Sequence, residues 1–557
     1  MYGTRRLGSA VGGGLALGAA AAAWLAPALA HAQNDPLALR GRDSDALLQL
    51  RAEVPDNAEP TLTATAPPAG DAEASGAFIL LGVAIEGAHA FPVSELAPYY
   101  EPYLTQPVTP EHLAQIAQRI TDHYRAAGYF LSRALVPSQH GGGVARIQII
   151  EGAITEIVLE GDGAAAARPF FRGVSGGSIA NIGDLERRLA LAGDTPGLSV
   201  RSRMEPDPND LRAHRLIVTA DLSPFEARAS LDNRGADSAG PWQFYARGAA
   251  NSLFRARDQA GLGVFTTPLA PEEFALGEAS YAVAFTDGAR LRISASMSRA
   301  HDGADMSSSD VGGDSEAISF SYEFPLQRTR RRGLWLGAAF ESRHQENVWA
   351  SGSGYTDELR VARAALRGML NENGRATSMI VQASFGLPML GASDASILRR
   401  SRADADATFA KLDFFSSHYR DIGDHFGLYA TLAGQWSPEP LLAAEQFFAG
   451  GAPFGRGYAY GEIAGDQGLA GLLEFRAGFQ PTADLVTFVQ GYFFLDAAEV
   501  WNLRTEGAAL ASAGAGVRVT FDDRVTAGLE LARPLTRGPS EEDGKDWRQF
   551  FSLAASY

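Results

Sequence analysis

Short segments in which apolar and polar residues alternate fill the chain after Pro224. In the segment 291–298 every odd position is apolar and every even position is polar. The segments 524–531 and 551–557 alternate in the same way. Alternation places the apolar side chains of a strand on one face and the polar ones on the other. It predicts a membrane β-barrel with an apolar outside, or alternatively an exported β-sandwich or β-helix.

The length of this region favours an antiparallel barrel of about 16 strands, at roughly 20 residues for each strand and its connection. The barrel domain then covers residues 224–557. A barrel of this size encloses a lumen instead of a core filled by side chains. Its last strand carries Phe551, Leu553 and Tyr557 on one face. We interpret these three residues as a C-terminal signal that is read by the barrel-assembly machinery.

Two smaller α+β modules precede the alternating segments. Residues 76–152 predict the order strand, helix, helix, strand, strand, and Thr109 and Pro110 mark the start of the longer helix. The same order returns more weakly in residues 153–223, which suggests a duplicated module. Small modules with open strand edges suit the binding of an extended peptide. The alternative is a pair of α+β domains of unknown purpose.

The N-terminal residues have the organisation of a secretory signal peptide. Arg5 and Arg6 precede an apolar, alanine-rich run that ends in overlapping small-x-small cleavage sites. We therefore predict a signal peptide at residues 1–32, with a membrane anchor as the alternative. Residues 33–75 are polar and contain several prolines. They predict a flexible linker, preceded at 35–53 by a short helix or, alternatively, a disordered tail.

Composition and charge narrow the range of functions. Hydrophobic residues make up 46% of the chain and charged residues 20%, which is too polar for a helical membrane protein. The net charge of −17 argues against binding of nucleic acid. The chain contains no cysteine, and its ten histidines are scattered without ligand spacing. Because nucleotide-binding and hydrolase motifs are also lacking, we expect a protein that is not an enzyme, without catalytic residues, metal or cofactor.

One glycine-rich stretch interrupts the strand pattern in the last third of the chain. Its sequence, at residues 450–458, is GGAPFGRGY. Glycine allows sharp turns and close approach to other backbone, which a strand does not need. The stretch therefore predicts a hairpin tip that packs closely against its surroundings and carries one charge, Arg456.

This tip resembles the extracellular hairpin loop of the two-partner secretion transporters, the TpsB proteins of the ShlB/FhaC/HecB family. That family shares a superfamily with BamA and TamA. The resemblance rests first on Phe454, Gly455, Arg456, Gly457 and Tyr458, in a loop that spans about 450–468. It also rests on a first-strand motif, Asp232, Asn233, Arg234 and Gly235, and on a strand around Asp496. Gly455 and Ala498 stand where the family usually has valine and glycine.

The resemblance implies an outer-membrane translocator whose two modules are POTRA domains in the periplasm. It also suggests that a helix at 35–53 is a plug for the pore. It implies transport of an unfolded partner, a TpsA-like exoprotein of the haemolysin or adhesin type, which the POTRA domains capture. The loop would enter the lumen and pair Arg456 with Asp496 on the barrel wall. Outer-membrane lipids and lipopolysaccharide are further implied partners, and nucleic acid is not. A BamA- or TamA-like assembly factor and a passive porin remain as alternatives.

Overall fold

The computed structural model describes residues 77–557 except 140–141, 236–239, 302–310, 350–353, 395, 398, 483–484 and 541–543. The expected signal peptide at 1–32 and the expected plug helix and linker at 33–75 lie outside the described residues. The backbone divides into two units, one ending at Ser223 and the other running from Pro224 to Tyr557. Each unit is described by itself.

Within the described ranges, no helix has both the length and the apolar character that a membrane-crossing helix needs.

In the first module, one long helix packs against a small sheet. Its strands are β1 (Phe78–Ile79), β2 (Gly82–Glu86), β3 (Pro107–Val108), β4 (Arg133–Leu135) and β5 (Val144–Ile150). Its helices are α4 (Val93–Leu96), α5 (Pro110–Ala126) and two 3-10 turns, η1 (Ala97–Tyr99) and η2 (Glu101–Tyr103). The first expected helix is broken into these short pieces, since Pro98 and Pro102 each lack a backbone N–H. The expected order of elements is present.

The long helix α5 follows its sequence signals closely. It begins at Pro110 behind the N-cap Thr109, whose side chain forms a capping box with His112. Its buried face carries Leu113, Ile116 and Ile120, spaced three and four residues apart. These side chains cover the sheet β2-β5-β4, in which β2 is parallel and β4 antiparallel to β5.

The second module repeats this arrangement of strands. Its elements are β6 (Ala153–Glu160), α6 (Ala164–Ala167), the 3-10 turn η3 (Arg168–Phe171), α7 (Ile182–Gly193), β7 (Leu198–Pro206) and β8 (Ala213–Leu222). The sheet order is β6-β8-β7, again with the first strand parallel and the other antiparallel to the central one. The short helix α6, which the sequence pattern did not indicate, completes the same element order as in the first module.

The end of α5 meets the start of α7, so that the two modules share hydrogen bonds. The backbone N–H of Ile182 donates to the carbonyl of Gly128, at 2.8 Å. Asn181, the N-cap of α7, donates through Nδ2 to the carbonyl of Ala127, at 3.2 Å. A Cβ atom on Gly128 would lie 2.9 Å from that same Nδ2. Gly128, where φ is +92°, thus ends the helix and leaves room for the second module.

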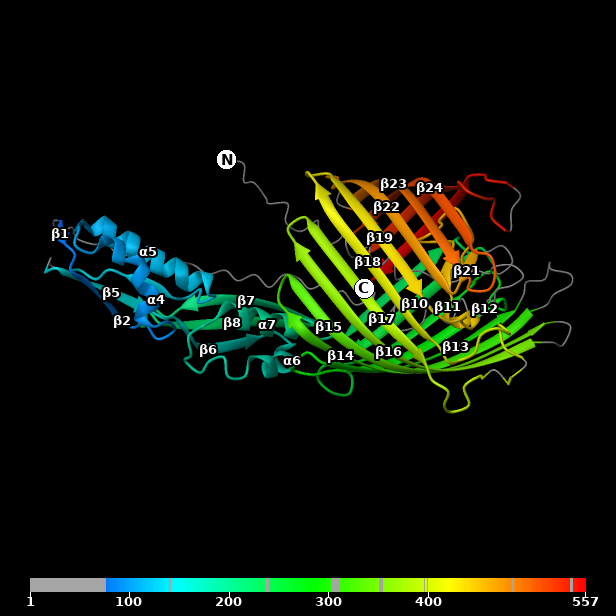
Figure 1. The fold of residues 1–557 in the computed structure, drawn as a ribbon, viewed down its shortest axis with the longest axis horizontal. Coiled ribbons are helices and arrows are strands. Elements are labelled where there is room, and N and C mark those ends of the chain that lie inside the picture. The colour runs from blue at the N-terminus through cyan, green and yellow to red at the C-terminus, as the bar shows by residue number, and fades with distance from the viewer. Residues whose placement is uncertain are drawn as a thin grey trace. The chain divides into compact units, whose positions relative to one another are not determined.

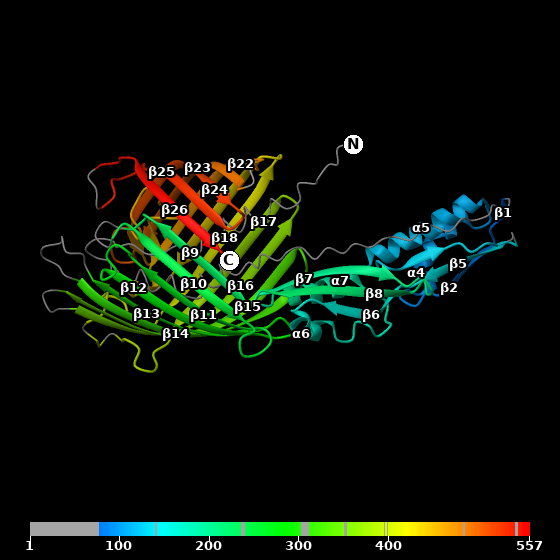
Figure 2. The same cartoon turned by 180° about the vertical axis from the view of Figure 1, so that it is seen from behind.

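The second unit is a closed antiparallel barrel, formed by sixteen strands of the described residues (Figures 1 and 2). The first eight strands are β9 (Phe225–Asp232), β10 (Gln243–Asn251), β11 (Asp258–Thr266), β12 (Phe274–Ala284), β13 (Arg290–His301), β14 (Val311–Arg328), β15 (Arg332–Trp349) and β16 (Gly354–Glu372). The others are β17 (Arg375–Gly386), β18 (Ala410–Ile422), β19 (Phe426–Trp436), β22 (Gln467–Phe479), β23 (Val486–Trp501), β24 (Ala508–Phe521), β25 (Val525–Pro534) and β26 (Arg548–Ser556). The expected membrane barrel of about 16 strands is confirmed, and the barrel closes where β26 pairs with β9.

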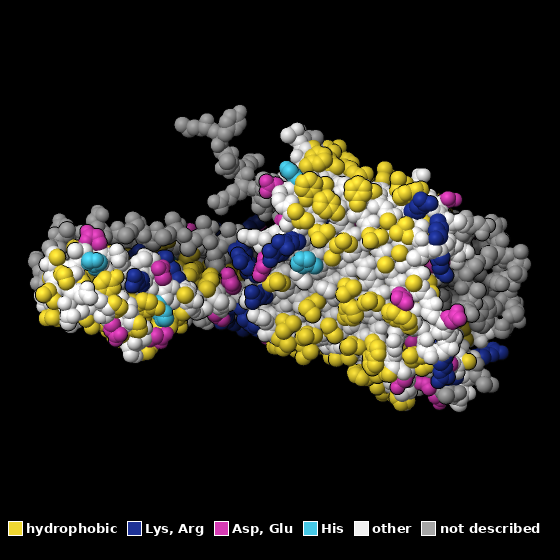
Figure 3. All heavy atoms as spheres, turned by 45° about the horizontal axis from the view of Figure 1, so that its top comes forward, with side chains coloured by type: hydrophobic (Ala, Val, Ile, Leu, Met, Phe, Trp, Pro, Cys, Tyr) yellow, Lys and Arg dark blue, Asp and Glu magenta, His cyan; other side chains and the backbone are white. Residues whose placement is uncertain are grey.

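The alternation of residue types along the strands places polar side chains inside and apolar ones outside. On β13, Leu291, Ile293 and Met297 are exposed on the outer surface, whereas Arg292 between them is buried. Apolar side chains cover much of the outer wall in Figure 3. A strand with these two faces can contact lipid on its outer side and a polar lumen on its inner side.

Connections of two lengths alternate around the barrel. Short turns follow β14, β16, β18 and β24, whereas the connections after β17, β19 and β25 span residues 387–409, 437–466 and 535–547. In outer-membrane barrels the short turns face the periplasm and the long loops face the cell exterior. The connection 437–466 therefore starts at the exterior end of the barrel.

Candidate functional site

The connection between β19 and β22 folds back into the barrel. It contains the 3-10 turn η5 (Ala443–Glu445) and a small hairpin in which β20 (Phe447–Ala449) pairs with β21 (Ile463–Gly465). Its apolar side chains Phe447, Phe454, Tyr458 and Ile463 belong to one buried cluster with inward-facing residues of the wall. The wall residues of this cluster include Ile380, Phe415, Tyr429, Leu472, Phe494, Leu510 and Phe550. We call residues 437–466 the lumen loop, because its hairpin lies against the inner wall.

The tip of the lumen loop is a tight turn built on glycine. The N–H groups of Gly450 and Gly451 donate to the carbonyls of Phe454 and Gly455, at 2.8 and 2.9 Å. Gly455 has φ of +101°, and a Cβ atom there would lie 2.9 Å from the Cα of Gly450. A valine at this position would be strained and would clash. Gly455, where the family usually has valine, therefore fits the backbone of this turn.

The two residues after Arg456 lie directly on the wall. A Cβ atom on Gly457 would be 2.8 Å from the backbone nitrogen of Pro534, so only glycine allows this approach. The N–H of Gly457 donates to Oγ of Ser512, at 3.1 Å. Tyr458 is 1% exposed and its hydroxyl donates to the carbonyl of Ala511, at 3.1 Å. The hydroxyl of Tyr458 thus fixes the side chain to the backbone of the wall.

The guanidinium of Arg456 binds two glutamates of the wall. Its Nη1 lies 3.0 Å from Oε2 of Glu474 on β22 and 3.0 Å from Oε2 of Glu530 on β25. The guanidinium also stacks on the ring of Phe494, 4.6 Å from the ring centre. All of these side chains are buried. A buried cation loses its hydration and needs nearby anions to compensate, and here two carboxylates supply that compensation.

Asp496 contacts the loop, but through the backbone. Its Oδ1 accepts hydrogen bonds from the N–H of Gly455 at 2.9 Å and from the hydroxyl of Ser512 at 2.6 Å. Its Oδ2 accepts from the N–H of Arg456 at 3.3 Å. The expected ion pair between the Arg456 side chain and Asp496 is thus corrected, because the register of β22 and β25 brings two glutamates closer to the guanidinium.

Glu474 and Glu530 connect the loop to further residues of the wall. Glu474 also pairs with Arg476 at 2.7 Å and with Arg518 at 2.8 Å. Glu530 also accepts the hydroxyl of Tyr492, at 2.7 Å. Sequence reasoning missed this network, since each member is one polar residue among many at inward positions of a strand.

The first-strand motif, residues 232–235, also contacts Glu530. Arg234 donates to Oε1 of Glu530 at 2.8 Å and stacks on Phe550. Asp232 ends β9 and accepts the N–H of Arg234, at 2.9 Å. The N–H of Gly235 donates to the carbonyl of Pro241, at 2.9 Å. Two motifs more than two hundred residues apart in the sequence therefore meet at Glu530.

The same motif also joins the first strand to the last. Asn233 accepts the N–H of Phe551 at 2.6 Å and donates to the carbonyl of Gln549 at 3.1 Å. Tyr557 extends this pairing of the first and last strands. Its N–H donates to the carbonyl of Ala227 at 2.8 Å, and its carbonyl accepts the N–H of Ala227 at 3.0 Å. Leu553 and Tyr557 are exposed on the outer surface, at 37% and 78%. The role of Phe551, Leu553 and Tyr557 as an assembly signal stays a prediction.

A second buried ion-pair network holds the base of the lumen loop. Glu445 lies 2.6 Å from Nζ of Lys411 on β18 and 2.8 Å from Nη2 of Arg363 on β16. Arg363 in turn lies 3.6 Å from Glu341 on β15. All four side chains are at most 8% exposed. These strands lie on a different part of the wall from those that bind Arg456, so the loop is held at two places.

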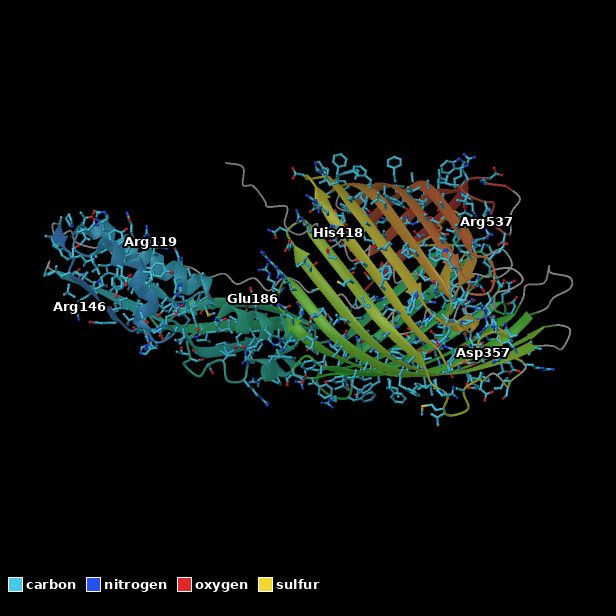
Figure 4. All side chains as sticks on the ribbon, viewed as in Figure 1. Arg119, Arg146, Glu186, Asp357, His418 and Arg537 are labelled. Carbon is cyan, nitrogen blue, oxygen red and sulfur yellow. The ribbon has the colours of Figure 1, made fainter. Side chains whose placement is uncertain are left out.

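Two more carboxylates tie the loop to the exterior connections. Glu462 pairs with Arg537 at 2.5 Å and accepts the N–H of Ser540 at 2.8 Å. Arg537 is labelled at that end of the barrel in Figure 4. Asp466 pairs with Arg402 and accepts the N–H of Leu441, at 2.9 Å. Among the described residues, no three His, Asp or Glu side chains are grouped so as to hold a metal ion.

Comparison with known proteins assigns the family. The model of haemolysin secretion/activation proteins ShlB/FhaC/HecB matches residues 216–519, and the model of the ShlB-type POTRA domain matches residues 78–152. The heme/hemopexin transporter protein HuxB of Haemophilus influenzae is 21% identical over 469 residues, which cover 81% of this chain and 82% of HuxB.

Two solved structures are similar in fold. CdiB from Escherichia coli aligns with a TM-score of 0.70 and 20% identity, over 90% of this chain and 94% of that one. CdiB from Acinetobacter baumannii aligns with a TM-score of 0.65 and 16% identity, over 92% and 97%. Because the first family model spans more than half of the sequence, the chain belongs to the haemolysin secretion/activation proteins ShlB/FhaC/HecB, the outer-membrane transporters of two-partner secretion.

Proposed function

We propose that this transporter secretes an unfolded, TpsA-like exoprotein through the barrel lumen, and that the lumen loop must move for the chain to pass. The observation that carries the proposal is the loop itself, which lies in the lumen and is held there by ion pairs, hydrogen bonds and a cluster of apolar side chains. Such contacts can break and form again without unfolding the barrel wall.

The periplasmic modules fit the capture of the exoprotein. We propose that residues 76–152 and 153–223 are two POTRA domains, since both have a three-stranded sheet with the same order of strands. Each sheet has open edges, to which an extended chain can add as a further strand. A signal peptide at residues 1–32 would direct the chain to the periplasm, and residues 33–75 would supply the plug helix and the linker.

The remaining partners follow from the surface of the barrel. Outer-membrane phospholipid and lipopolysaccharide would cover the exposed apolar band. The barrel-assembly machinery would bind the strand that carries Phe551, Leu553 and Tyr557. We assign transport without catalysis or a cofactor, in keeping with the family.

A reversible cross-link tests whether the loop moves. The chain contains no cysteine, so Glu445→Cys and Lys411→Cys introduce the only two thiols. A short, reducible bis-thiol reagent then ties the base of the loop to β18. We expect secretion of the partner to stop after cross-linking and to return after reduction. Secretion that continues through the cross-linked barrel would contradict a moving loop.

Gene deletion separates the proposed transporter from the alternatives. We expect loss of one secreted partner, while other outer-membrane proteins keep their normal levels. A BamA- or TamA-like assembly factor would instead lower the levels of many barrels. A passive porin would change the uptake of small solutes and leave protein secretion intact.

A further inference from the structure

The outer surface of the barrel carries a compact polar array near the periplasmic turns. β17 and β18 pair so that Arg375 lies opposite Arg420 and Thr377 lies opposite His418. The alternating neighbours on these strands, such as Ala376 and Phe415, are buried on the inner side. All four polar side chains therefore lie on the outer face. His418 is labelled near this end of β18 in Figure 4.

Among the residues that the structure describes, the two arginines face each other without an ion-paired or hydrogen-bonded partner. Like charges directly opposite one another on adjacent strands destabilise a sheet. Among the described residues, neither guanidinium forms an ion pair or a hydrogen bond. Glu372 lies opposite Arg375 on the other side, on β16, but it does not approach within ion-pair distance. The pair is thus a positive site on the outside of the barrel that Glu372 offsets only in part, since no carboxylate of the described residues pairs with either guanidinium.

The surroundings place this site at the boundary between lipid tails and headgroups. Met379 and Ile422 on the same two strands are exposed and apolar. Phe426 stacks on Phe475, with ring centres 5.6 Å apart, close to the periplasmic end of the neighbouring strands. Outer-membrane barrels carry girdles of aromatic side chains at both membrane interfaces, and this pair lies where the periplasmic girdle is expected. Figure 3 shows Lys or Arg side chains, with some Asp or Glu among them, and a histidine gathered beside the apolar surface at one end of the barrel.

We propose that Arg375 and Arg420 together bind the phosphate group of an anionic phospholipid in the periplasmic leaflet. A phosphate between two guanidinium groups replaces their repulsion by two charge-assisted attractions. The hydroxyl of Thr377, 2.8 Å from Nδ1 of His418, lies beside them and adds polar groups for the headgroup. An exoprotein inside the lumen cannot reach these side chains, because they point away from it.

The test uses the full-length transporter in vesicles of phosphatidylcholine alone or mixed with phosphatidylglycerol. Stability is measured as the temperature at which the barrel unfolds, seen as the loss of the folded protein's gel mobility. We expect phosphatidylglycerol to raise this temperature for the natural protein by a few degrees. For the double variant Arg375→Gln and Arg420→Gln we expect little rise. In pure phosphatidylcholine the choline cation of each headgroup offsets its phosphate, so the repulsion between the arginines persists in the natural protein. The variant, which lacks this repulsion, should be at least as stable there.

The double variant is thus expected to be less stable than the natural protein only when phosphatidylglycerol is present. A general structural role of the two arginines would lower its stability in both kinds of vesicle. Arg299→Gln is the matched control, since Arg299 is an exposed arginine near the opposite end of the wall and pairs with Asp314 at 2.9 Å. It should keep the full response to phosphatidylglycerol. An equal response of the double variant, or its lower stability in phosphatidylcholine, would overturn the proposal. So would an equal rise produced by free inorganic phosphate, because the site would then bind the anion without the lipid.

Discussion

Nη1 of Arg456, in the loop inside the lumen, lies 3.0 Å from Oε2 of Glu530 on the strand β25. Removing one partner of a buried ion pair costs about 3–5 kcal/mol, because the remaining charge loses its compensation. We therefore expect Arg456→Ala to loosen the lumen loop and to reduce secretion much more than barrel insertion. Secreted partner is compared with the amount of heat-modifiable barrel in membranes, and an equal loss of both would count against the proposed role.

A double-mutant cycle decides which carboxylate is the partner of Arg456. The cycle with Glu530→Gln should give a large coupling energy, since the two side chains are in direct contact. The cycle with Asp496→Asn should give a smaller one, because Asp496 binds the backbone and asparagine keeps an acceptor oxygen. The thermal stability of the four proteins of each cycle is the measurement. Stronger coupling to Asp496 would restore the ion pair that the family resemblance implied.

Replacing Gly455 by the valine that the family usually has should destabilise the tip of the lumen loop. Gly455→Val places a branched side chain where φ is +101° and where the Cβ atom meets the Cα of Gly450 at 2.9 Å. The backbone strain alone costs roughly 1–3 kcal/mol. We expect easier proteolysis of the loop and a leakier pore in single-channel recordings. Gly491→Ala is the control, because a Cβ atom at Gly491 has no neighbour within 4 Å.

Glu445 should act as a second anchor that is independent of Arg456. Glu445→Gln weakens the contacts to Lys411 and Arg363, which are 2.6 and 2.8 Å away. We expect larger channel currents even with Arg456 intact, and additive effects when both anchors are removed, because they share no partner. Glu499→Gln changes an exposed glutamate on the outside of β23 and should leave the currents unchanged. Currents equal to those of the natural protein in Glu445→Gln would show that the base of the loop needs no anchor.

The first periplasmic module should lose stability in acid through Glu151. Burial acts to raise the pKa of this carboxyl, but the N–H groups of Ala90 and His89 and the hydroxyl of Tyr124 outweigh it and hold the pKa below its usual value. A lowered pKa in the folded state means that the stabilisation is complete above about pH 4.3, the value of a free glutamate. It is lost as the pH falls through the folded-state pKa.

A fluorophore at Asp122→Cys, an exposed site on α5, reports urea unfolding of this module, because the natural chain has no other thiol. The urea midpoint should fall in acid for the natural protein and stay more nearly constant for Glu151→Gln. Glu86→Gln removes an exposed glutamate of the same module and should keep the natural pH dependence. A parallel acid loss in Glu151→Gln would assign the effect to other groups.

The barrel and the modules could be predicted because their signals are local. The alternation of residues 291–298 gives β13 its apolar outer face, and Thr109, Pro110 and Gly128 mark the ends of α5. The broken first helix was missed although Pro98 and Pro102 are visible in the sequence. The short helix α6 was missed because four alanines have no periodicity to detect.

The amino-acid sequence by itself determined the antiparallel barrel, its size, and the glycine-rich loop with one arginine. It could do so because strand alternation and glycine backbone freedom act over a few neighbouring residues. Only the tertiary structure decided that Arg456 binds Glu474 and Glu530, that Asp496 holds the loop backbone, and that Glu445 holds the loop base. Carboxylates recur at many inward positions, and the one that meets a given cation depends on strand register and barrel closure, which bring together residues far apart in the chain.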